Sequence, residues 1–265
     1  MINTQMIEHI VKLGIYSAGI NGETPVSIML IANPESGKTT ILSKFANVPS
    51  VKFTTDLNTN MFVDFCYEYQ ANLKKTIIIG DFLRITSKKH SSQKNILTIL
   101  NACMEEGYTG KLPMGQYIEK KITANLITSI TQDEVSDKRH KWSQLGFMSR
   151  LLPVTYAYNN ETAEKIMQYI KDRVYHQDKP FEFIIEKEKV DIMLSSNFAD
   201  DLEVIKSEVL SKLKETNLYG FRLQRQFQVL AMANALASKR NVVTKDDVDM
   251  IREISKFINF EYTRI

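Results

Sequence analysis

Hydrophobic residues recur along the first part of the chain with two different spacings. The first predicted element is a helix within residues 1–20, whose apolar positions share one face: Ile7, Ile10, Val11 and Ile15. Asn21-Gly22-Glu23-Thr24-Pro25 then ends this helix. Short apolar runs separated by helical patterns predict three strands, at residues 26–31, 51–55 and 75–79. Strands that alternate with helices and are apolar on both faces are typical of a parallel sheet covered by helices on each side.

The pattern changes in the second half of the chain. Two more apolar runs predict the fourth and fifth strands, at residues 122–130 and 151–156. The polar, charged segment 133–144 between them is predicted to be a loop. After residue 158 the pattern is helical to the end of the chain. With a boundary at 158–165, the sequence therefore predicts an α/β domain over residues 1–160 and a small all-helical domain over 161–265.

Composition and charge exclude several classes of protein. The chain has 265 residues, 43% of them hydrophobic, which is enough for one large α/β domain and a smaller helical one. Its net charge of +3 does not by itself indicate a nucleic-acid partner. Cys66 and Cys103 lie in apolar helical patterns without the spacing of a metal site or a disulfide framework. With no signal-peptide pattern and no membrane-length apolar run, we expect a cytoplasmic protein with no membrane partner.

The turn after the first strand has the features of a phosphate-binding loop. Its residues are Ala32, Asn33, Pro34, Glu35, Ser36, Gly37, Lys38, Thr39 and Thr40. In such a loop backbone N–H groups surround the phosphates, Lys38 reaches the β- and γ-phosphates, and the Thr39 hydroxyl is a ligand of Mg²⁺. Ala32 stands where the motif has its first glycine, so the loop entrance must use a backbone geometry that alanine allows. We predict ATP and Mg²⁺ as ligands; the alternative is a chance Gly-Lys-Thr cap on an ordinary helix.

An ATPase also needs an acidic group at the end of a neighbouring strand, for the metal and for the attacking water. Asp81 has this place after the strand at 75–79, and we predict it as a metal and catalytic residue. The common form of this element ends in Asp-Glu, whereas this chain has Gly80-Asp81 and supplies one carboxylate. Slow hydrolysis follows from that shortage. The alternative for Asp81 is a cap on the next segment. Asp56, just after the strand at 51–55, is a second carboxylate at a strand end, and a turn or cap is its favoured interpretation.

Two arginines complete the pattern. Arg150 follows Ser149 and directly precedes the strand at 151–156. Arg222 begins an alanine-rich helix that extends to residue 237. With the phosphate-binding loop, this order of elements resembles the AAA+ ATPases, and in particular the minichromosome maintenance (MCM) branch. Arg150 looks like that branch's arginine finger, and Arg222 falls at the position of its sensor-2 arginine.

Other segments are similar to the same family. Residues 95–107 look like the helix that follows the acidic strand, and residues 124–131 cover the sensor-1 strand. The sensor-1 residue itself stays open among Asn125, Ser129 and Thr131. Alignment with the MCM-like Ile-Asp-Glu-Phe sequence would put Asp81 in the glutamate position and Gly80 in the position of the metal-binding aspartate.

The resemblance implies a fold and an assembly. The fold would be a P-loop AAA+ parallel sheet sandwiched by helices, followed by a helical lid. The assembly would be a ring or helical homo-oligomer, with a hexamer expected, in which Arg150 acts on the ATP of the adjacent subunit. Arg222 would sense nucleotide bound to its own or a neighbouring subunit. A guanidinium suits this role because its paired donors can hold the negative charge that develops on a transferred phosphoryl group. The alternative for each arginine is a surface pair with a nearby carboxylate.

Residues 107–121 look like the β-hairpin that projects into the ring channel in this family. In such a hairpin the lysines would contact phosphates and the tyrosines would stack on bases. The residues concerned are Lys111, Lys120, Lys121, Tyr108 and Tyr117. The alternative is an ordinary solvated hairpin. A second basic cluster lies at residues 87–94. The leading prediction is a slow, DNA-stimulated ATPase in replication, a helicase, loader or related motor of a viral or mobile element, with a replication protein as a further partner. The alternative is a hydrolysis-poor, nucleotide-dependent assembly switch or adaptor for a protein partner. A small-molecule kinase is disfavoured because an arginine finger and lid suit oligomers.

Overall fold

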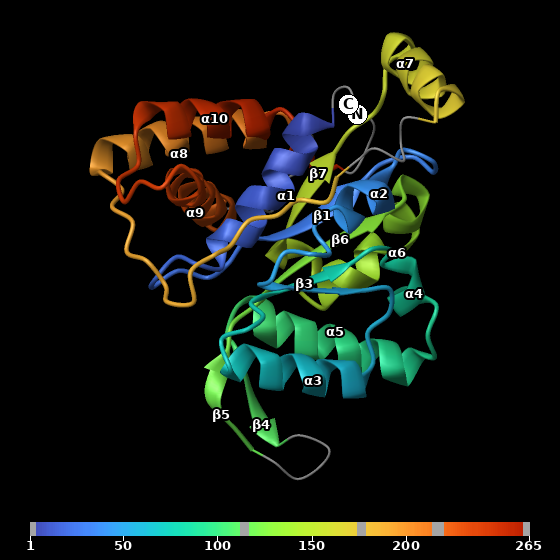
Figure 1. The fold of residues 1–265 in the computed structure, drawn as a ribbon, viewed down its shortest axis with the longest axis vertical. Coiled ribbons are helices and arrows are strands. Elements are labelled where there is room, and N and C mark those ends of the chain that lie inside the picture. The colour runs from blue at the N-terminus through green and yellow to red at the C-terminus, as the bar shows by residue number, and fades with distance from the viewer. Residues whose placement is uncertain (1–3, 112–116, 174–178, 214–219, 262–265) are drawn as a thin grey trace.

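The computed structural model describes residues 4–111, 117–173, 179–213 and 220–261. Its centre is an all-parallel sheet of five strands in the order β2-β3-β6-β1-β7 (Figure 1). These strands are β1 (Ser27–Ile31), β2 (Val51–Thr54), β3 (Thr76–Ile79), β6 (Asn125–Ile130) and β7 (Leu151–Thr155). β4 (Tyr108–Lys111) and β5 (Tyr117–Ile122) form a separate antiparallel hairpin. The predicted α/β class with a parallel sheet is therefore confirmed.

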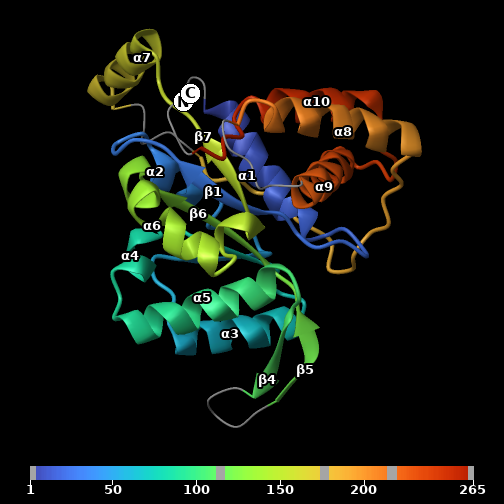
Figure 2. The same cartoon turned by 180° about the vertical axis from the view of Figure 1, so that it is seen from behind.

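Both faces of the sheet are buried because its strands are apolar on both sides. In β1, Ile28 and Leu30 contribute to one hydrophobic core, whereas Met29 and Ile31 contribute to the other. The first core is completed by α1 (Gln5–Ser17), α2 (Lys38–Ser43) and the C-terminal helices. The second is completed by α3 (Thr59–Gln70), α5 (His90–Met104) and α6 (Gln132–Gln144), with the short α4 (Leu83–Thr86) at its edge. Figure 2 shows α3 and α5 side by side below the sheet.

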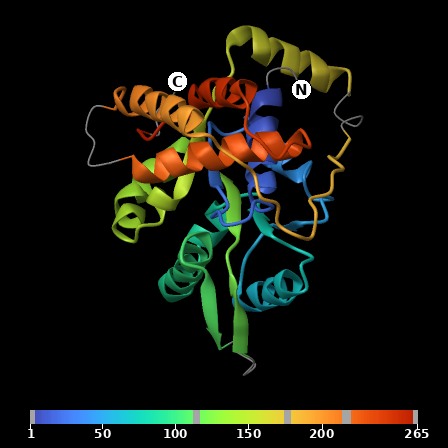
Figure 3. The same ribbon diagram turned by 90° about the vertical axis from the view of Figure 1, so that its left-hand side faces the viewer.

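The C-terminal helices are α8 (Ser196–Leu210), α9 (Phe221–Ala237) and α10 (Lys245–Ser255), which pack on one another, and α9 packs on α1 (Figure 3). Helix α1 is inserted between them and the sheet. A Cβ atom on Gly14 would lie 2.5 Å from Cδ1 of Ile28 and 3.2 Å from Cδ1 of Ile127, so this glycine permits the close approach of α1 to the strands. One continuous hydrophobic core therefore contains residues from both sides of the predicted boundary at residue 160.

Segment 133–144 was predicted to be a loop, and that prediction is wrong: it forms α6. Val135 and Trp142, seven positions apart, lie on one side of the helix and are buried. Trp142 packs edge-on against Phe82 and Phe147, with ring centroids 5.6 and 5.8 Å away. Two apolar residues on one face are thus sufficient to dock an otherwise polar helix. The predicted strand at 122–130 is also divided, because β5 ends at residue 122 and β6 begins at residue 125.

The helical pattern predicted after residue 158 is interrupted by an extended connector over residues 179–194. Phe181 stacks on Phe45 at 4.7 Å, and Phe183 stacks on Tyr16 at 5.1 Å. These aromatic side chains attach the connector to α1 and to the segment after α2. Before it, α7 (Asn160–Lys171) stands away from the body of the protein, and Thr162 is its one buried residue (Figure 1). Across the described ranges, no helix is both long and apolar enough to cross a membrane.

Candidate functional site

The loop between β1 and α2 folds around the side chain of Lys38. Its Nζ atom donates hydrogen bonds to the carbonyl oxygens of Ala32 and Asn33, at 2.9 and 2.6 Å, and to Oγ of Ser36, at 3.2 Å. Gly37 has φ = 74°, a left-handed conformation that glycine adopts without a steric penalty. Ala32 is not among the residues with positive φ, so its methyl group needs no strained backbone. The substitution of the first motif glycine is therefore compatible with this loop.

Lys38 is buried, and burial lowers the pKa of its ammonium group because the charged form loses hydration. The negative charges of Asp81 and Glu134 oppose this shift. Two carboxylates from different strand ends therefore act on the same lysine. Glu134 lies in the first turn of α6, which starts directly after β6. It was missed in the sequence because segment 133–144 was interpreted as a loop; the signal available was an acidic residue soon after a buried strand.

Carboxyl ends of three neighbouring strands meet at this edge of the sheet, since β6 lies between β1 and β3. The carbonyl oxygen of Gly80, after β3, accepts hydrogen bonds from Oγ of Ser129 at 2.7 Å and from Oγ1 of Thr39 at 3.4 Å. Asp81 is the next residue, half-buried, and its Oδ1 accepts a hydrogen bond from the backbone N–H of Leu83 at 3.0 Å. Asp81 is thus bonded to the first residue of α4 while remaining beside the loop.

The three residues left open for the sensor-1 position lie in different places. Nδ2 of Asn125 donates to the carbonyl oxygens of Gly14 and Val26, at 2.8 and 2.9 Å. These contacts put Asn125 at the amino edge of the sheet, away from Lys38. Thr131 precedes α6 and makes no capping hydrogen bond with its side chain. Ser129 is the candidate that faces the end of β3 next to the loop.

The donor set fits Mg²⁺, which in proteins is held by one or two carboxylates together with waters and substrate phosphates. The Thr39 hydroxyl and the Asp81 carboxylate would supply oxygen ligands from the ends of β1 and β3, the two strands that flank β6. A Cβ atom on Gly80 would lie 3.5 Å from Cγ2 of Thr39 and 3.5 Å from Cζ of Phe53, which is ordinary contact. The backbone at position 80 therefore accommodates a Cβ atom, as an acidic residue there would require. In the described part of the chain, no three His, Cys, Asp or Glu residues gather as a protein-only metal site.

Two tyrosines after β7 connect the loop to an open pocket. The hydroxyl groups of Tyr156 and Tyr158 donate to the carbonyl oxygen of Ser36, at 3.1 and 2.7 Å. Burial raises the pKa of both phenols, so both remain donors at neutral pH. The pocket beside them has a volume of about 430 Å³. It is also lined by Gln5 and Met6, at the start of α1, and by Phe257. No pattern in the sequence associated either tyrosine with the loop.

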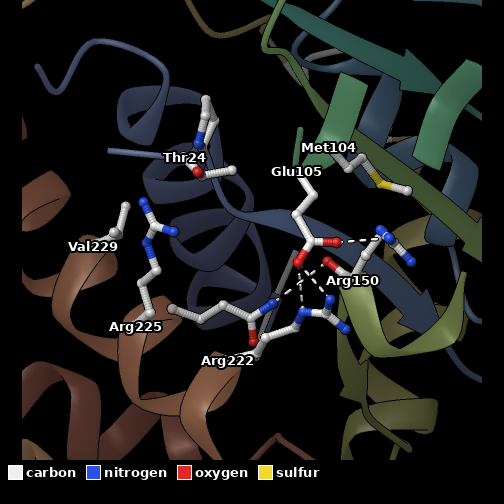
Figure 4. Close-up of a pocket in the computed structure, with 9 residues that line it drawn as sticks. Thr24, Met104, Glu105, Arg150, Arg222, Arg225 and Val229 are labelled. Carbon is white, nitrogen blue, oxygen red and sulfur yellow. Dashed lines mark hydrogen bonds and ion pairs between the residues drawn. The ribbon is translucent and has the colours of Figure 1, made fainter. Parts of the chain in front are cut away.

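Arg150 and Arg222 come together at the opposite edge of the sheet. Arg150 ends the short 3₁₀ helix η1 (Met148–Arg150) immediately before β7, whereas Lys38 follows β1, which runs parallel to β7. The five residues of β1 separate these two edges by about 16 Å. Arg150 and Arg222 line a pocket of about 60 Å³ together with Thr24 and Pro25, which precede β1 (Figure 4).

One carboxylate joins the two guanidinium groups. Oε2 of Glu105 lies 2.7 Å from Nη2 of Arg150, and its Oε1 accepts from Nε of Arg222 at 3.1 Å and also from Nη2 of that arginine (Figure 4). Nη1 of Arg222 donates to Oγ of Ser149 at 2.6 Å. Nη1 of Arg150 donates to the carbonyl oxygen of Gly146, also at 2.6 Å. The carboxylate pairing weighed as an alternative in the sequence is thus present, and both arginines share it.

The β4–β5 hairpin projects from the body beneath α3 and α5 (Figures 1 and 3). Lys111, Tyr117 and Lys121 are exposed on it, whereas Tyr108 packs edge-on against Phe62 at 5.2 Å. The side chain of Lys120 lies outside the described residues. In the second basic cluster, Lys88 pairs with Asp56 at 2.7 Å. Asp56 also accepts from the N–H of Leu57 at 2.7 Å, which agrees with its interpretation as a turn residue.

Comparison with known proteins adds no identification. No protein-family model matches the chain, and no curated protein matches it either.

Proposed function

We propose that this protein is an AAA+ ATPase that binds ATP and Mg²⁺, hydrolyses ATP slowly as an oligomer, and acts on DNA in replication. The observation that carries the proposal is the loop around Lys38. A buried ammonium group held by three oxygen atoms of its own loop is poised to exchange them for phosphate oxygens, which are better partners for a cation.

The residues at the carboxyl edge of the sheet have separate roles in this proposal. Lys38 and the loop N–H groups would bind the β- and γ-phosphates, and the pocket beside Tyr156 and Tyr158 would receive the nucleoside. Thr39 and Asp81 would hold Mg²⁺, whose charge stabilises the negative charge on the phosphates when it is bound. Ser129 would orient the end of β3 through its hydrogen bond to Gly80. With Asp81 engaged by the metal, Glu134 is the carboxylate left near Lys38.

The arginines would act on a different nucleotide from the one bound by their own chain. Arg150 and Arg222 lie at the amino edge of the sheet, about 16 Å from the loop edge. In a head-to-tail assembly the amino edge of one subunit faces the carboxyl edge of the next, and repetition of that contact generates a ring or a helix. This arrangement favours action in trans for both arginines.

DNA binding is supported by the projecting hairpin. Exposed Lys111 and Lys121 would contact phosphates, and exposed Tyr117 would stack on a base. The packing of Tyr108 against Phe62 removes one of the two stacking residues expected there. A double substitution of Lys111 and Lys121 by alanine would weaken DNA binding and flatten its dependence on salt.

A nucleotide-dependent assembly switch is the second candidate, and Gly80 is the observation that favours it, because only one acidic residue follows β3. The deciding experiment measures ATP binding and steady-state hydrolysis with and without single- and double-stranded DNA. Turnover that DNA raises, and that Lys38→Ala and Arg150→Ala abolish, supports the motor. ATP binding and oligomerisation without turnover under any condition supports the switch. Absence of ATP binding by the unmodified protein refutes both.

A further inference from the structure

Glu105 occupies an unusual position between Arg150 and Arg222. It caps the C-terminal end of α5, at the root of the β4–β5 hairpin, and its two carboxylate oxygens are divided between the two guanidinium groups (Figure 4). The three residues come from distant parts of the chain: the end of α5, the turn before β7 and the start of α9. No sequence pattern indicated this contact.

The two arginines differ in how firmly the fold holds them. The side chain of Arg150 is 16% exposed, and its Nη1 is bonded to the carbonyl oxygen of Gly146. The side chain of Arg222 is 46% exposed, and its contacts to the α/β body are those to Glu105 and Ser149. Two guanidinium groups repel each other, so their proximity needs an anion between them. Glu105 supplies that anion and connects the start of α9 to the turn before β7.

The arginine pair keeps donors for another ligand after binding Glu105. A guanidinium has five N–H donors. The accessible ones belong mainly to Arg222, whose side chain is 46% exposed, because Nε of Arg150 is buried. One carboxylate therefore fixes the position of both cations without using all their donors, and the pair retains a net positive charge.

We propose that Glu105 is a positioning residue that holds Arg150 and Arg222 together as one unit for the phosphates bound by the adjacent subunit. This proposal rests on the proposed function, since it assumes that the arginines act in trans. A single shared carboxylate makes the two arginines act jointly. Loss of Glu105 would leave the Arg222 guanidinium with its bond to Ser149 as the remaining contact to the α/β body, and would leave the loop around Lys38 untouched.

The test mixes two kinds of defective subunit. An Arg150→Ala subunit binds ATP but offers no finger, whereas a Lys38→Ala subunit offers its arginines but binds no ATP. Each is inactive alone, and their mixture regains turnover if the arginines act in trans. Adding Glu105→Gln to the Lys38→Ala subunit is expected to reduce the regained turnover at least tenfold. Adding it instead to the Arg150→Ala subunit is expected to leave the regained turnover unchanged.

Two controls separate positioning from folding. Glu106→Gln changes the next carboxylate, which is exposed, and is expected to keep the regained turnover when placed in the Lys38→Ala subunit. Glu105→Asp retains the negative charge and is expected to restore part of the regained turnover. ATP affinity of the Glu105→Gln single variant is expected to match that of the unmodified protein, and its thermal unfolding is expected to remain one cooperative transition, although at a lower temperature.

Three results would overturn the proposal. Full activity with Glu105→Gln in the arginine-donating subunit shows that the arginines need no shared carboxylate. Equal loss from either subunit shows a general structural defect. A mixture of the two parent variants that stays inactive, although each binds its partner, refutes action in trans and removes the basis of this proposal, whereas ATP binding and turnover by the unmodified protein test the proposed ATPase separately.

Discussion

Substitution of Asp247 by asparagine is expected to destabilise the C-terminal helices by about 3 kcal/mol. The side chain of Asp247 is completely buried and accepts hydrogen bonds from Nη1 and Nη2 of Arg240 at 2.8 and 2.7 Å and from Nδ2 of Asn234 at 2.7 Å. It also forms a capping box with Thr244. This network joins the end of α9 to the start of α10.

The magnitude follows from what asparagine removes. An amide in place of the carboxylate loses the negative charge and presents N–H donors to the donors of Arg240. Removal of one partner from a buried ion pair costs about 3–5 kcal/mol. The side chain of Arg240 is 35% exposed, so water compensates part of its charge and the lower end of that range applies. Asp246→Asn, on the exposed neighbour, is the matched control and is expected to change stability by less than about 0.5 kcal/mol.

The dependence on pH gives an independent check. Burial alone would raise the pKa of Asp247, but the hydrogen bonds from Arg240, Thr244 and Asn234 outweigh it and hold the pKa below its ordinary range. A carboxyl group whose pKa is lower in the folded than in the unfolded state stabilises the protein above the unfolded pKa, about 3.9 for aspartate. That stabilisation is lost as the pH falls through the folded pKa.

The free energy of unfolding can be measured by urea denaturation followed by circular dichroism. The measurement compares both variants with the unmodified protein between pH 7 and pH 3. The difference between the unmodified protein and Asp247→Asn should be largest at pH 7 and should shrink below about pH 4. A difference below about 1 kcal/mol at pH 7, or one that is constant across this range, would refute the reasoning.

Three other predictions concern the loop edge of the sheet and the second core. Gly80→Asp should raise ATP turnover about tenfold or more, equivalent to about 1.4 kcal/mol of barrier, because its Cβ fits beside Thr39; unchanged turnover would argue against a missing carboxylate. Tyr158→Phe should cost about 1 kcal/mol in thermal unfolding through loss of the 2.7 Å bond to Ser36, and an effect near zero would contradict that bond. Burial raises the pKa of Cys66 to about 12 and also that of Cys103, so neither thiol should react with a disulfide reagent at pH 8 before unfolding; rapid native-state labelling would disprove this.

Local patterns in the sequence predicted the elements that depend on neighbouring residues. The apolar run of β1 followed by Gly37, Lys38 and Thr39 was sufficient to predict the strand, the turn and the helix that follows. Strands buried on both faces indicated a parallel sheet because few other arrangements cover both sides.

Features that depend on distant contacts were missed or left open. Helix α6 is polar except for Val135 and Trp142, and their burial depends on Phe82 and Phe147 from elsewhere in the chain. Asn125 and Ser129 are four positions apart in the same strand, and only the strand's place in the sheet shows which one ends near Lys38. Glu105 belongs to a Glu-Glu pair at a helix end, a pattern typical of a solvent-exposed surface. Its contacts with both arginines required the three-dimensional fold.

The position of α1 between the C-terminal helices and the sheet affects how the protein can move. Because Gly14 brings this helix directly against the strands while its other side packs on α9, the C-terminal helices have no independent hinge against the sheet. Swinging them aside would expose a continuous hydrophobic core to water, at a free-energy cost that grows with the apolar area uncovered. In the proposed assembly each subunit would then behave as a stiff body, and the gap between neighbouring subunits would open and close during the nucleotide cycle.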